Sequence, residues 1–243
     1  MKDQKKDISE RGNISILDCT FRDGGYYTNW IFESKIINEY LDICNQGLCD
    51  VVELGLRTPR SGEYLGPHAY TCPEYFKYCK DFRNLKYSAL VNWKDICLVE
   101  YPENLFLNNA KDDVIDIVRI AIKLEDLRNS KGFIECLKSR GYEISINIQN
   151  CDSLLNADLN ILRGDLMHLQ PDILYLADTN GFLEPLKINT LVTKINKLIK
   201  IPIGVHMHNN KSLAFANSLT ALESGATFID STFTGIGRGP GNA

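Results

Sequence analysis

The sequence lacks the features that mark membrane-spanning, secreted and nucleic-acid-binding proteins. None of its eight cysteines forms a Cys-x-x-Cys pair, and no apolar run approaches the roughly 20 residues that a membrane span requires. The first seven residues are mostly charged and lack an apolar core, so they do not predict a secretory signal. Basic residues number 27 against 31 acidic ones, which gives no support for binding nucleic acid or an anionic membrane. These absences predict a cytoplasmic protein with reduced thiols.

What the sequence does have is a regular alternation of apolar runs and helical patterns. Eight runs are predicted to be strands: residues 14–21, 51–56, 87–91, 114–122, 144–148, 173–177, 203–208 and 227–232. Strands that alternate with helices indicate a parallel sheet, and eight such units predict a (β/α)8 barrel, the TIM barrel. A doubly wound sheet is the alternative, but no Gly-x-Gly-x-x-Gly opens the first helix.

Two of the helical patterns have predictable ends. Residues 185–199 carry apolar side chains at i, i+3, i+4 and i+7, and Pro185 suits the first helical position. Residues 212–225 are bounded by Ser212, the predicted N-cap, and by Gly225, the predicted C′ residue. Residues 57–72 are predicted to form a long loop after the second strand.

The composition indicates one domain. With 243 residues, of which 44% are hydrophobic, the chain is long enough for a single large core. We expect residues 1–12 to be a disordered N-terminal tail and residues 13–243 to be one catalytic barrel. The sequence stops soon after the eighth strand, so the last helix is expected to be missing. A homo-oligomeric partner or a C-terminal extension is then expected to cover the gap in the barrel.

The segment Val-His-Met-His-Asn-Asn, at residues 205–210, is the most informative one. Side chains at i and i+2 of a strand point the same way, so His206 and His208 would face one point. In a closed barrel the first strand lies beside the eighth, and Asp23, which follows the first strand, would meet both histidines at the C-terminal mouth. Nitrogen and oxygen ligands of this kind suit a catalytic divalent metal.

Charged residues beside this cluster are expected to act on the substrate. Arg22 precedes the proposed ligand Asp23, and a guanidinium is well suited to a developing oxyanion. Glu53 interrupts the apolar second strand, and a carboxylate in a barrel lumen needs a partner, for which Arg22 is the obvious choice. Cys19 also lies close to the proposed site, but nothing nearby marks it as an activated nucleophile.

These segments resemble the motifs of the HMG-CoA lyase-like superfamily of metal-dependent aldolases and Claisen enzymes, in particular its 4-hydroxy-2-oxovalerate aldolase-type members. The resemblance covers nearly the whole chain, with the motifs in the same order. The matching segments are Asp-x-Thr-x-Arg-Asp-Gly at residues 18–24, the second-strand glutamate Glu53, Leu-Ala-Asp-Thr-x-Gly at 176–181, His-x-His-Asn at 206–209 and a glycine-rich loop ending in Gly-Asn at 235–242.

The resemblance implies a role for each matching residue. Asp23, His206 and His208 correspond to metal ligands, and Arg22 corresponds to the cation that stabilises an enolate. Asn242 matches a position that is an additional metal ligand in some relatives. The resemblance therefore implies a divalent cation, Mn²⁺ or Mg²⁺, with Zn²⁺ as a further option.

Two further residues are candidates for substrate binding. Asp178, at the end of the sixth strand, either orients a ligand or water or caps the next segment. Arg238, among the glycines after the eighth strand, is expected to contact an anionic group, because loops at this place in a barrel often hold phosphate. The alternative for Arg238 is a solvated side chain on a flexible turn.

The sequence departs from the family where proton transfer is concerned. The aldolases carry a histidine base soon after Arg-Asp-Gly, and residues 25–30 of this chain contain none. The acyl-CoA lyases carry a cysteine in the glycine-rich loop, and this loop has none. We expect Tyr27 to point into the mouth from an extended segment and to act as the acid or base, with a bound water or His68 as alternatives.

The expected function is a divalent-metal-dependent C–C lyase, an aldolase that cleaves a 4-hydroxy-2-oxo acid to pyruvate and an aldehyde. One alternative in the same fold is a Claisen-type acyltransferase that joins an acyl-CoA and a 2-oxo acid. The other alternative is a metal-binding barrel without catalysis.

Overall fold

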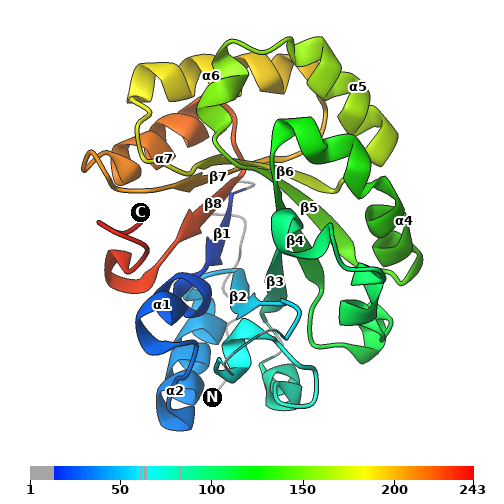
Figure 1. Cartoon of the computed structure of the whole chain (residues 1–243). Coiled ribbons are helices and arrows are strands. Elements are labelled where there is room, and N and C mark those ends of the chain that lie inside the picture. Colours follow the sequence, from blue (N-terminus) through cyan, green and yellow to red (C-terminus); the bar gives the residue numbers. More distant parts are fainter. Residues whose placement is uncertain (1–13, 61, 63–64, 83) are drawn as a thin grey trace, which may run out of the picture.

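Eight parallel strands form a closed barrel in the computed structural model, which describes residues 14–60, 62, 65–82 and 84–243 (Figure 1). The strands are β1 (Ser15–Asp18), β2 (Val51–Leu56), β3 (Lys86–Asn92), β4 (Ile117–Ile122), β5 (Glu143–Ile148), β6 (Ile173–Asp178), β7 (Ile203–Met207) and β8 (Phe228–Ser231). Each strand pairs with the next one along the chain, and Leu17 of β1 lies opposite Asp230 of β8. The predicted barrel is therefore confirmed, while the tail predicted at residues 1–12 lies outside the described residues.

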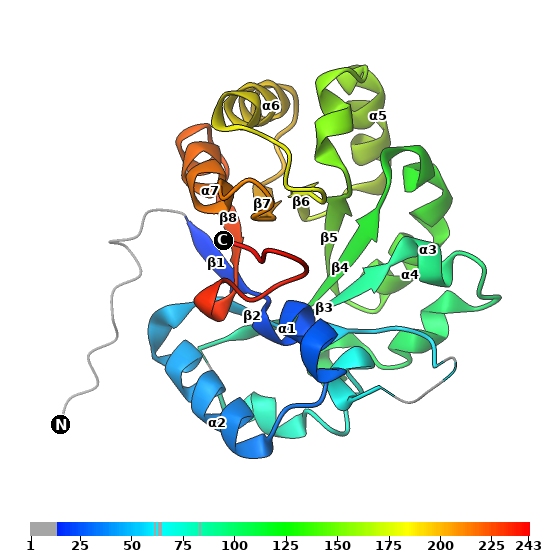
Figure 2. The same cartoon turned by 60° about the vertical axis from the view of Figure 1, so that its left-hand side comes forward.

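Helices surround the barrel (Figures 1 and 2). The α-helices are α1 (Thr20–Thr28), α2 (Ser34–Ile43), α3 (Trp93–Ile96), α4 (Lys131–Ser139), α5 (Leu159–Leu169), α6 (Pro185–Leu198) and α7 (Ala214–Glu223). The short helical turns are η2 (Cys44–Leu48), η3 (Pro67–Ala69), η4 (Lys77–Asp81), η5 (Pro102–Phe106), η6 (Ala110–Asp112), η7 (Leu124–Ser130), η8 (Cys151–Leu155) and η9 (Phe233–Gly235). Within the described residues, none of these helices combines the length and the apolar character needed to cross a membrane.

The seam between β1 and β8 has no covering α-helix after β8 in the described part of the chain. The chain instead continues from β8 into η9 and a glycine-rich loop, which lies beside α1 in Figure 2. Phe215 and Leu219 of α7, which precedes this seam in the sequence, are exposed. A partner or an extension that covers the seam stays a prediction.

The first strand ends earlier than the apolar run at residues 14–21 predicts. Asp18 accepts hydrogen bonds from the backbone N–H of Thr20 at 2.9 Å and from its hydroxyl at 3.0 Å. These bonds turn the chain directly into α1. The prediction that residues 25–30 are extended is therefore wrong, because Tyr26 and Tyr27 lie on that helix.

The predicted N-cap of α7 is also wrong. Ser212 has a φ of 59° and lies before the helix, which begins at Ala214. The Asn209 side chain instead accepts a hydrogen bond from the backbone N–H of Ala214 at 3.1 Å. At the other end, Gly225 follows the C-cap with a φ of 105°, as its role as C′ residue requires.

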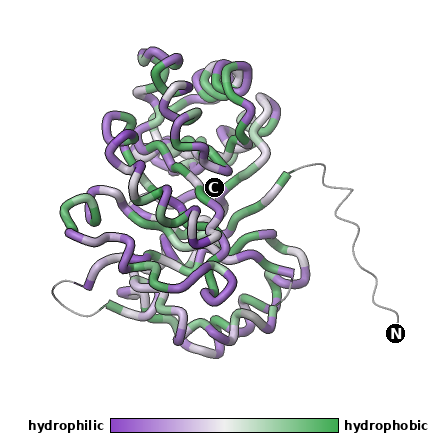
Figure 3. The backbone as a smooth tube through the Cα atoms, turned by 90° about the vertical axis from the view of Figure 1, so that its right-hand side faces the viewer, coloured by the Kyte–Doolittle hydropathy of each residue, from purple (hydrophilic) through white to green (hydrophobic). Residues whose placement is uncertain are grey.

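Apolar side chains pack both outside and inside the barrel. The larger core lies between the strands and the surrounding helices. Hydrophobic and hydrophilic residues alternate along the chain (Figure 3). A small cluster that includes Leu17, Val51 and Ile117 comes from β1, β2 and β4. Glu53 and Arg119 follow Val51 and Ile117 by two residues, so they point to the same side of their strands. The lumen is therefore apolar at one level and charged at the next level toward the mouth.

An irregularity in β2 shapes the mouth of the barrel. The register between β2 and β3 shifts between Glu53 and Gly55, and Gly55 has a φ of 148°. A Cβ atom at this position would lie 1.8 Å from the carbonyl oxygen of His68. Only glycine therefore allows the loop after β2 to pack this closely against the strand.

Candidate active site

The residues at the mouth come from both ends of the sequence. Arg22 and Asp23 lie in the first turn of α1, directly after β1, and both are buried. His206 is on β7, and His208 follows its last residue. Because β1 and β7 both pair with β8, the barrel brings Asp23 close to His206. Among the described residues, His208 is not part of the group of close donor atoms.

Arg22 is held by two carboxylates. Its Nε atom donates to Glu53 Oε1, and its Nη1 atom donates to Asp23 Oδ1 at 2.5 Å. Burial opposes the charge on Arg22, but the attraction of Asp23 and Glu53 outweighs it and raises the pKa of the guanidinium above its ordinary value. The backbone carbonyl of Arg22 also accepts a hydrogen bond from Trp30 Nε1 at 3.1 Å. The predicted pairing of Arg22 with Glu53 is present, and the cation is fixed and permanently charged.

Both histidines have Nδ1 within hydrogen-bond distance of an oxygen. His206 Nδ1 lies 2.8 Å from Asp230 Oδ2, and His208 Nδ1 lies 2.9 Å from the backbone carbonyl oxygen of Asp178. Both partners accept hydrogen bonds, so each Nδ1 donates. Burial, followed by the neighbouring His206, lowers the pKa of His208 to about 4. Histidines that each donate Nδ1–H to an oxygen have the tautomer that binds metal through Nε2.

Asn242 reaches the cluster from the glycine-rich loop. Its Nδ2 atom donates to Asp23 Oδ2, and its backbone forms a bridge with His208. The loop comes close here, since a Cβ atom on Gly237 would lie 2.7 Å from Asn242 Cγ. The Oδ1 atom of Asn242 is buried and has no hydrogen-bond partner among the described residues. This oxygen is therefore available to a ligand.

The donor set fits a divalent cation. One ligand atom from each of Cys19, Asp23 and His206 lies within 4.8 Å of the others. His206 Nε2, like Asn242 Oδ1, is buried without a hydrogen-bond partner in the described part of the chain. Buried polar atoms are normally paired, so these two beside a carboxylate are available to a cation. Nitrogen and oxygen donors in this arrangement suit Mn²⁺, Mg²⁺ or Zn²⁺.

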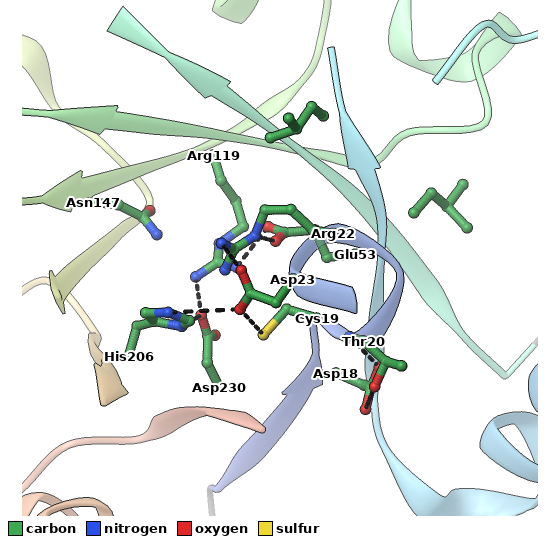
Figure 4. Close-up of polar contacts among 12 residues, drawn as sticks. Asp18, Cys19, Thr20, Arg22, Asp23, Glu53, Arg119, Asn147, His206 and Asp230 are labelled. Carbon is green, nitrogen blue, oxygen red and sulfur yellow. Dashed lines mark hydrogen bonds and ion pairs between the residues drawn. The ribbon is translucent and has the colours of Figure 1, made fainter. Parts of the chain in front are cut away.

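Arg119 and Asp230, neither of which was predicted from the sequence, also contact residues of this site. Arg119 is fully buried in the lumen and forms ion pairs of 2.6 Å with Glu53 and with Asp230 (Figure 4). Burial opposes ionisation of Asp230, but the attraction of Arg119 and the hydrogen bond from His206 hold its pKa at about 2. The contacts thus run from Arg22 through Glu53, Arg119 and Asp230 to His206. This chain of ion pairs links Arg22 to His206.

Glu53 was predicted because it is a charged residue within an apolar strand. The same pattern holds for Arg119 and Asp230. Arg119 stands in Ile-Val-Arg-Ile-Ala-Ile, and Asp230 stands in Phe-Ile-Asp-Ser. Each is a charge within an apolar strand, and such a charge must find a partner inside the barrel. The sequence could have nominated both, although their partners depend on the closed barrel.

Comparison with known proteins agrees with this geometry. A model of the HMGL-like family matches residues 118–243, which is more than half of the chain. The chain belongs to the HMGL-like family. The N-terminal domain of a provisionally named aldolase from Bacteroides vulgatus is 32% identical, with a TM-score of 0.86 over 94% of this chain and 76% of that one. The carboxyl transferase domain of Rhizobium etli pyruvate carboxylase, 18% identical with a TM-score of 0.71 over 92% of this chain and 40% of that one, shares the fold.

Curated relatives are more distant but match along nearly the whole chain. The oxaloacetate decarboxylase of Mycobacterium tuberculosis (strain ATCC 25618 / H37Rv) is 28% identical over 93% of this chain and 66% of its own length. The 4-hydroxy-2-oxovalerate aldolase of Geobacillus genomosp. 3 is 28% identical over 94% of this chain and 67% of its own length. This HMGL-like chain therefore spans about two thirds of the length of these relatives.

Two predicted substrate residues of this HMGL-like chain make other contacts. Both carboxylate oxygens of Asp178 accept backbone N–H groups of the following loop, from Phe182 at 3.1 Å and from Leu183 at 3.0 Å. This is the capping alternative noted for Asp178. Arg238 is exposed and its guanidinium lies over the ring of Tyr26 at 5.2 Å. Substrate contacts for Asp178 and Arg238 stay predictions.

Among the described residues, neither candidate base is hydrogen-bonded to a residue of the cluster. Tyr27 is 61% exposed, and its hydroxyl donates to the carbonyl oxygen of Gly237 at 2.8 Å. His68 is fully buried, with its ring 4.6 to 4.9 Å from the rings of three phenylalanines, namely Phe21, Phe32 and Phe76. Burial lowers the pKa of His68 to about 4. The hydroxyl of Tyr27 therefore links α1 to the glycine-rich loop by a hydrogen bond. His68 packs among aromatic side chains next to α1.

Proposed function

We propose that this chain is the catalytic barrel of a divalent-metal-dependent C–C lyase that cleaves a 4-hydroxy-2-oxo acid to pyruvate and an aldehyde. One observation carries the proposal. The Arg22 guanidinium, fixed by Glu53, is bonded to the same carboxylate of Asp23 that faces His206 Nε2 at 3.8 Å. A permanent cation thus lies beside the donors of a metal site, as an enzyme that forms an enolate from a 2-oxo acid requires.

The residues of the site divide the work between them. Asp23, His206 and His208 would hold a divalent cation, which would supply Lewis acidity at the site. Arg22 holds the oxygen that becomes negative as the C3–C4 bond breaks, and Glu53 keeps the guanidinium in place. The 4-hydroxyl passes its proton to a bound water, and the C3–C4 electron pair becomes the pyruvate enolate as the aldehyde leaves. C3 of the enolate then takes up a proton from water.

A second candidate is the decarboxylation of a 2-oxo acid that carries a carboxylate on C3. This reaction forms the same pyruvate enolate and releases CO₂, but it has no hydroxyl proton to remove. The position of Tyr27 favours decarboxylation. Tyr27 was the residue expected to accept the hydroxyl proton, but its own O–H donates a hydrogen bond to the carbonyl oxygen of Gly237. The name of the relative from Mycobacterium tuberculosis agrees with this reaction.

The test compares two substrates with one enzyme preparation. Pyruvate release would be measured from 4-hydroxy-2-oxovalerate and from oxaloacetate, with Mn²⁺ and with a chelator. Both reactions should need the metal, and both should fall strongly in Arg22→Lys. Arg163→Lys is the matched control, because Arg163 is an exposed arginine on α5.

The outcomes separate the proposals. Cleavage of the hydroxy acid supports the aldolase, and cleavage of oxaloacetate alone supports the decarboxylase. Release of free thiol from acetyl-CoA in the presence of a 2-oxo acid would indicate the Claisen reaction. Metal binding with no turnover of any of these substrates would indicate the non-catalytic barrel and overturn the proposed activity.

A further inference from the structure

Cys19 faces the carboxylate of the candidate metal site. It lies between β1 and α1 and is fully buried. Its Sγ atom is 3.5 Å from Asp23 Oδ2 and 3.3 Å from the backbone carbonyl oxygen of Ser231. The oxygen that Cys19 contacts is the one that also meets Asn242 Nδ2 and His206 Nε2. The sulfur is therefore placed against the carboxylate oxygen on which the donor groups converge.

An unpaired nitrogen gives a second, independent indication of a ligand here. His206 is only 4% exposed, and its Nε2 has no hydrogen-bond partner in the described part of the structure. Nδ1 donates to Asp230, so Nε2 lies on the other side of the ring, 3.8 Å from Asp23 Oδ2. A buried ring nitrogen of this kind normally has a partner.

The three atoms have the separation that a shared cation needs. Cys19 Sγ, one Asp23 oxygen and one His206 nitrogen all lie within 4.8 Å of one another. A cation that binds sulfur at about 2.3 Å and nitrogen or oxygen at about 2.0–2.2 Å fits between them after a small contraction.

We propose that Cys19 is a sulfur ligand of this site and makes it selective for thiophilic divalent cations, such as Zn²⁺ or Co²⁺, over Mg²⁺. Thiolate is a soft ligand that prefers these ions, whereas Mg²⁺ prefers oxygen. The thiol proton passes to water as the cation binds, so binding of Zn²⁺ releases one proton more in the wild type than in a variant without this thiol. The inference deepens the proposed function and rests on its cation site.

Co²⁺ is the probe, because a cysteine ligand gives Co²⁺ a thiolate-to-metal charge-transfer band in the near ultraviolet. The experiment would use the full chain with its three accessible cysteines, Cys72, Cys97 and Cys136, changed to serine. Cys19→Ser is the test variant in this background. Cys151→Ser is the matched control, because Cys151 is equally buried but outside the metal cluster.

The background protein and the Cys151→Ser control should show the band, and Cys19→Ser should not. Affinity for Zn²⁺, measured by competition with a chelator, should fall about 10- to 100-fold in Cys19→Ser, on the scale seen when metal-site residues are removed. Affinity for Mg²⁺ should change by less than threefold, about 0.7 kcal/mol. X-ray absorption at the zinc edge of the wild type should show a sulfur neighbour at about 2.3 Å, which needs no variant to fold.

A site that binds Co²⁺ without the band, or zinc without a sulfur neighbour, would overturn the role of Cys19 and leave the proposed lyase standing. A band that persists in Cys19→Ser would have the same consequence. Failure to bind any divalent cation would overturn both proposals. The sulfur signal together with no turnover would support the Cys19 site and contradict the proposed activity alone.

Discussion

Replacing Arg119 by methionine should weaken both the fold and the metal site. Methionine has a similar length and is apolar, so the packing is largely kept while the charge is lost. The substitution removes the 2.6 Å ion pairs to Glu53 and Asp230 and the contact of the guanidinium with the ring of Tyr175. These groups are fully buried, so water does not replace the lost partner.

The cost can be worked out from the partners that remain. Breaking a buried ion pair by removing one partner costs about 3–5 kcal/mol, because the other charge stays buried. Glu53 still has Arg22, and Asp230 still has His206, so we expect the lower end, about 3 kcal/mol. Asp230 should also hold the His206 ring less firmly, and loss of such an orienting contact typically costs about 10- to 100-fold in metal affinity.

Acid should affect the wild type and the variant differently. The pKa of Asp230 is about 2 in the folded protein, below its ordinary value of 3.8. A carboxyl group with a lowered pKa adds to folding stability above pH 3.8. This contribution disappears as the pH falls toward 2. Arg119→Met removes the main attraction, so this contribution should shrink and the variant should lose less additional stability over that interval.

Urea unfolding followed by circular dichroism, together with Mn²⁺ binding by calorimetry, would test these expectations. Arg57→Met is the matched control, because Arg57 forms a buried 2.7 Å ion pair with Asp113 outside the metal cluster. The control should lose stability and keep its Mn²⁺ affinity. A loss of less than about 1 kcal/mol in Arg119→Met, the scale of an exposed pair, or an unchanged Mn²⁺ affinity, would refute the argument.

Four further variants test single residues of this region. Asp23→Asn should lose bound metal while the fold survives, as elemental analysis and circular dichroism would show; full metal occupancy would contradict its role as ligand. Arg22→Lys should keep the metal and lose about 2.7–4 kcal/mol of transition-state stabilisation, measured from kcat/KM, because the planar guanidinium is lost. Tyr27→Phe removes one hydrogen bond of about 1 kcal/mol and should change turnover about fivefold, whereas a loss of about 100-fold would restore Tyr27 as the acid or base. Burial raises the pKa of Asp18 to about 6 from 3.8, so folding stability should fall by about 2–3 kcal/mol as the pH rises from 4 to beyond 6. Asp18→Asn should flatten that pH dependence of the urea midpoint, and an unaltered slope would contradict it.

The sequence alone determined the architecture, because each strand of a parallel barrel is buried on both faces and reads as an apolar run. All eight runs correspond to strands, and the ends of β2 match the run at residues 51–56 without change. Periodicity also located α6, since one apolar face repeats along it. The end of β1 was misjudged because the apolar run continues to Phe21, while the hydrogen bonds between Asp18 and Thr20 decide where the strand ends.

For the site, the sequence could nominate residues whose position follows from the order of the strands. His206 and His208 share a strand end, and Arg22 and Asp23 follow the strand that closes the barrel, so topology alone brings them together. The roles assigned to them remain predictions. The base assigned to Tyr27 depended on an extended backbone that α1 does not have.

Only the tertiary structure decided which charges pair inside the lumen. Arg119 joins Glu53 on β2 with Asp230 on β8, strands that are not its neighbours in the sheet. Such contacts cross the barrel, so they depend on its closure, on the register of the strands and on the side to which each side chain points. Sequence patterns record which residues face inward. The distance across the barrel, which decides whether two inward charges touch, is a property of the folded chain.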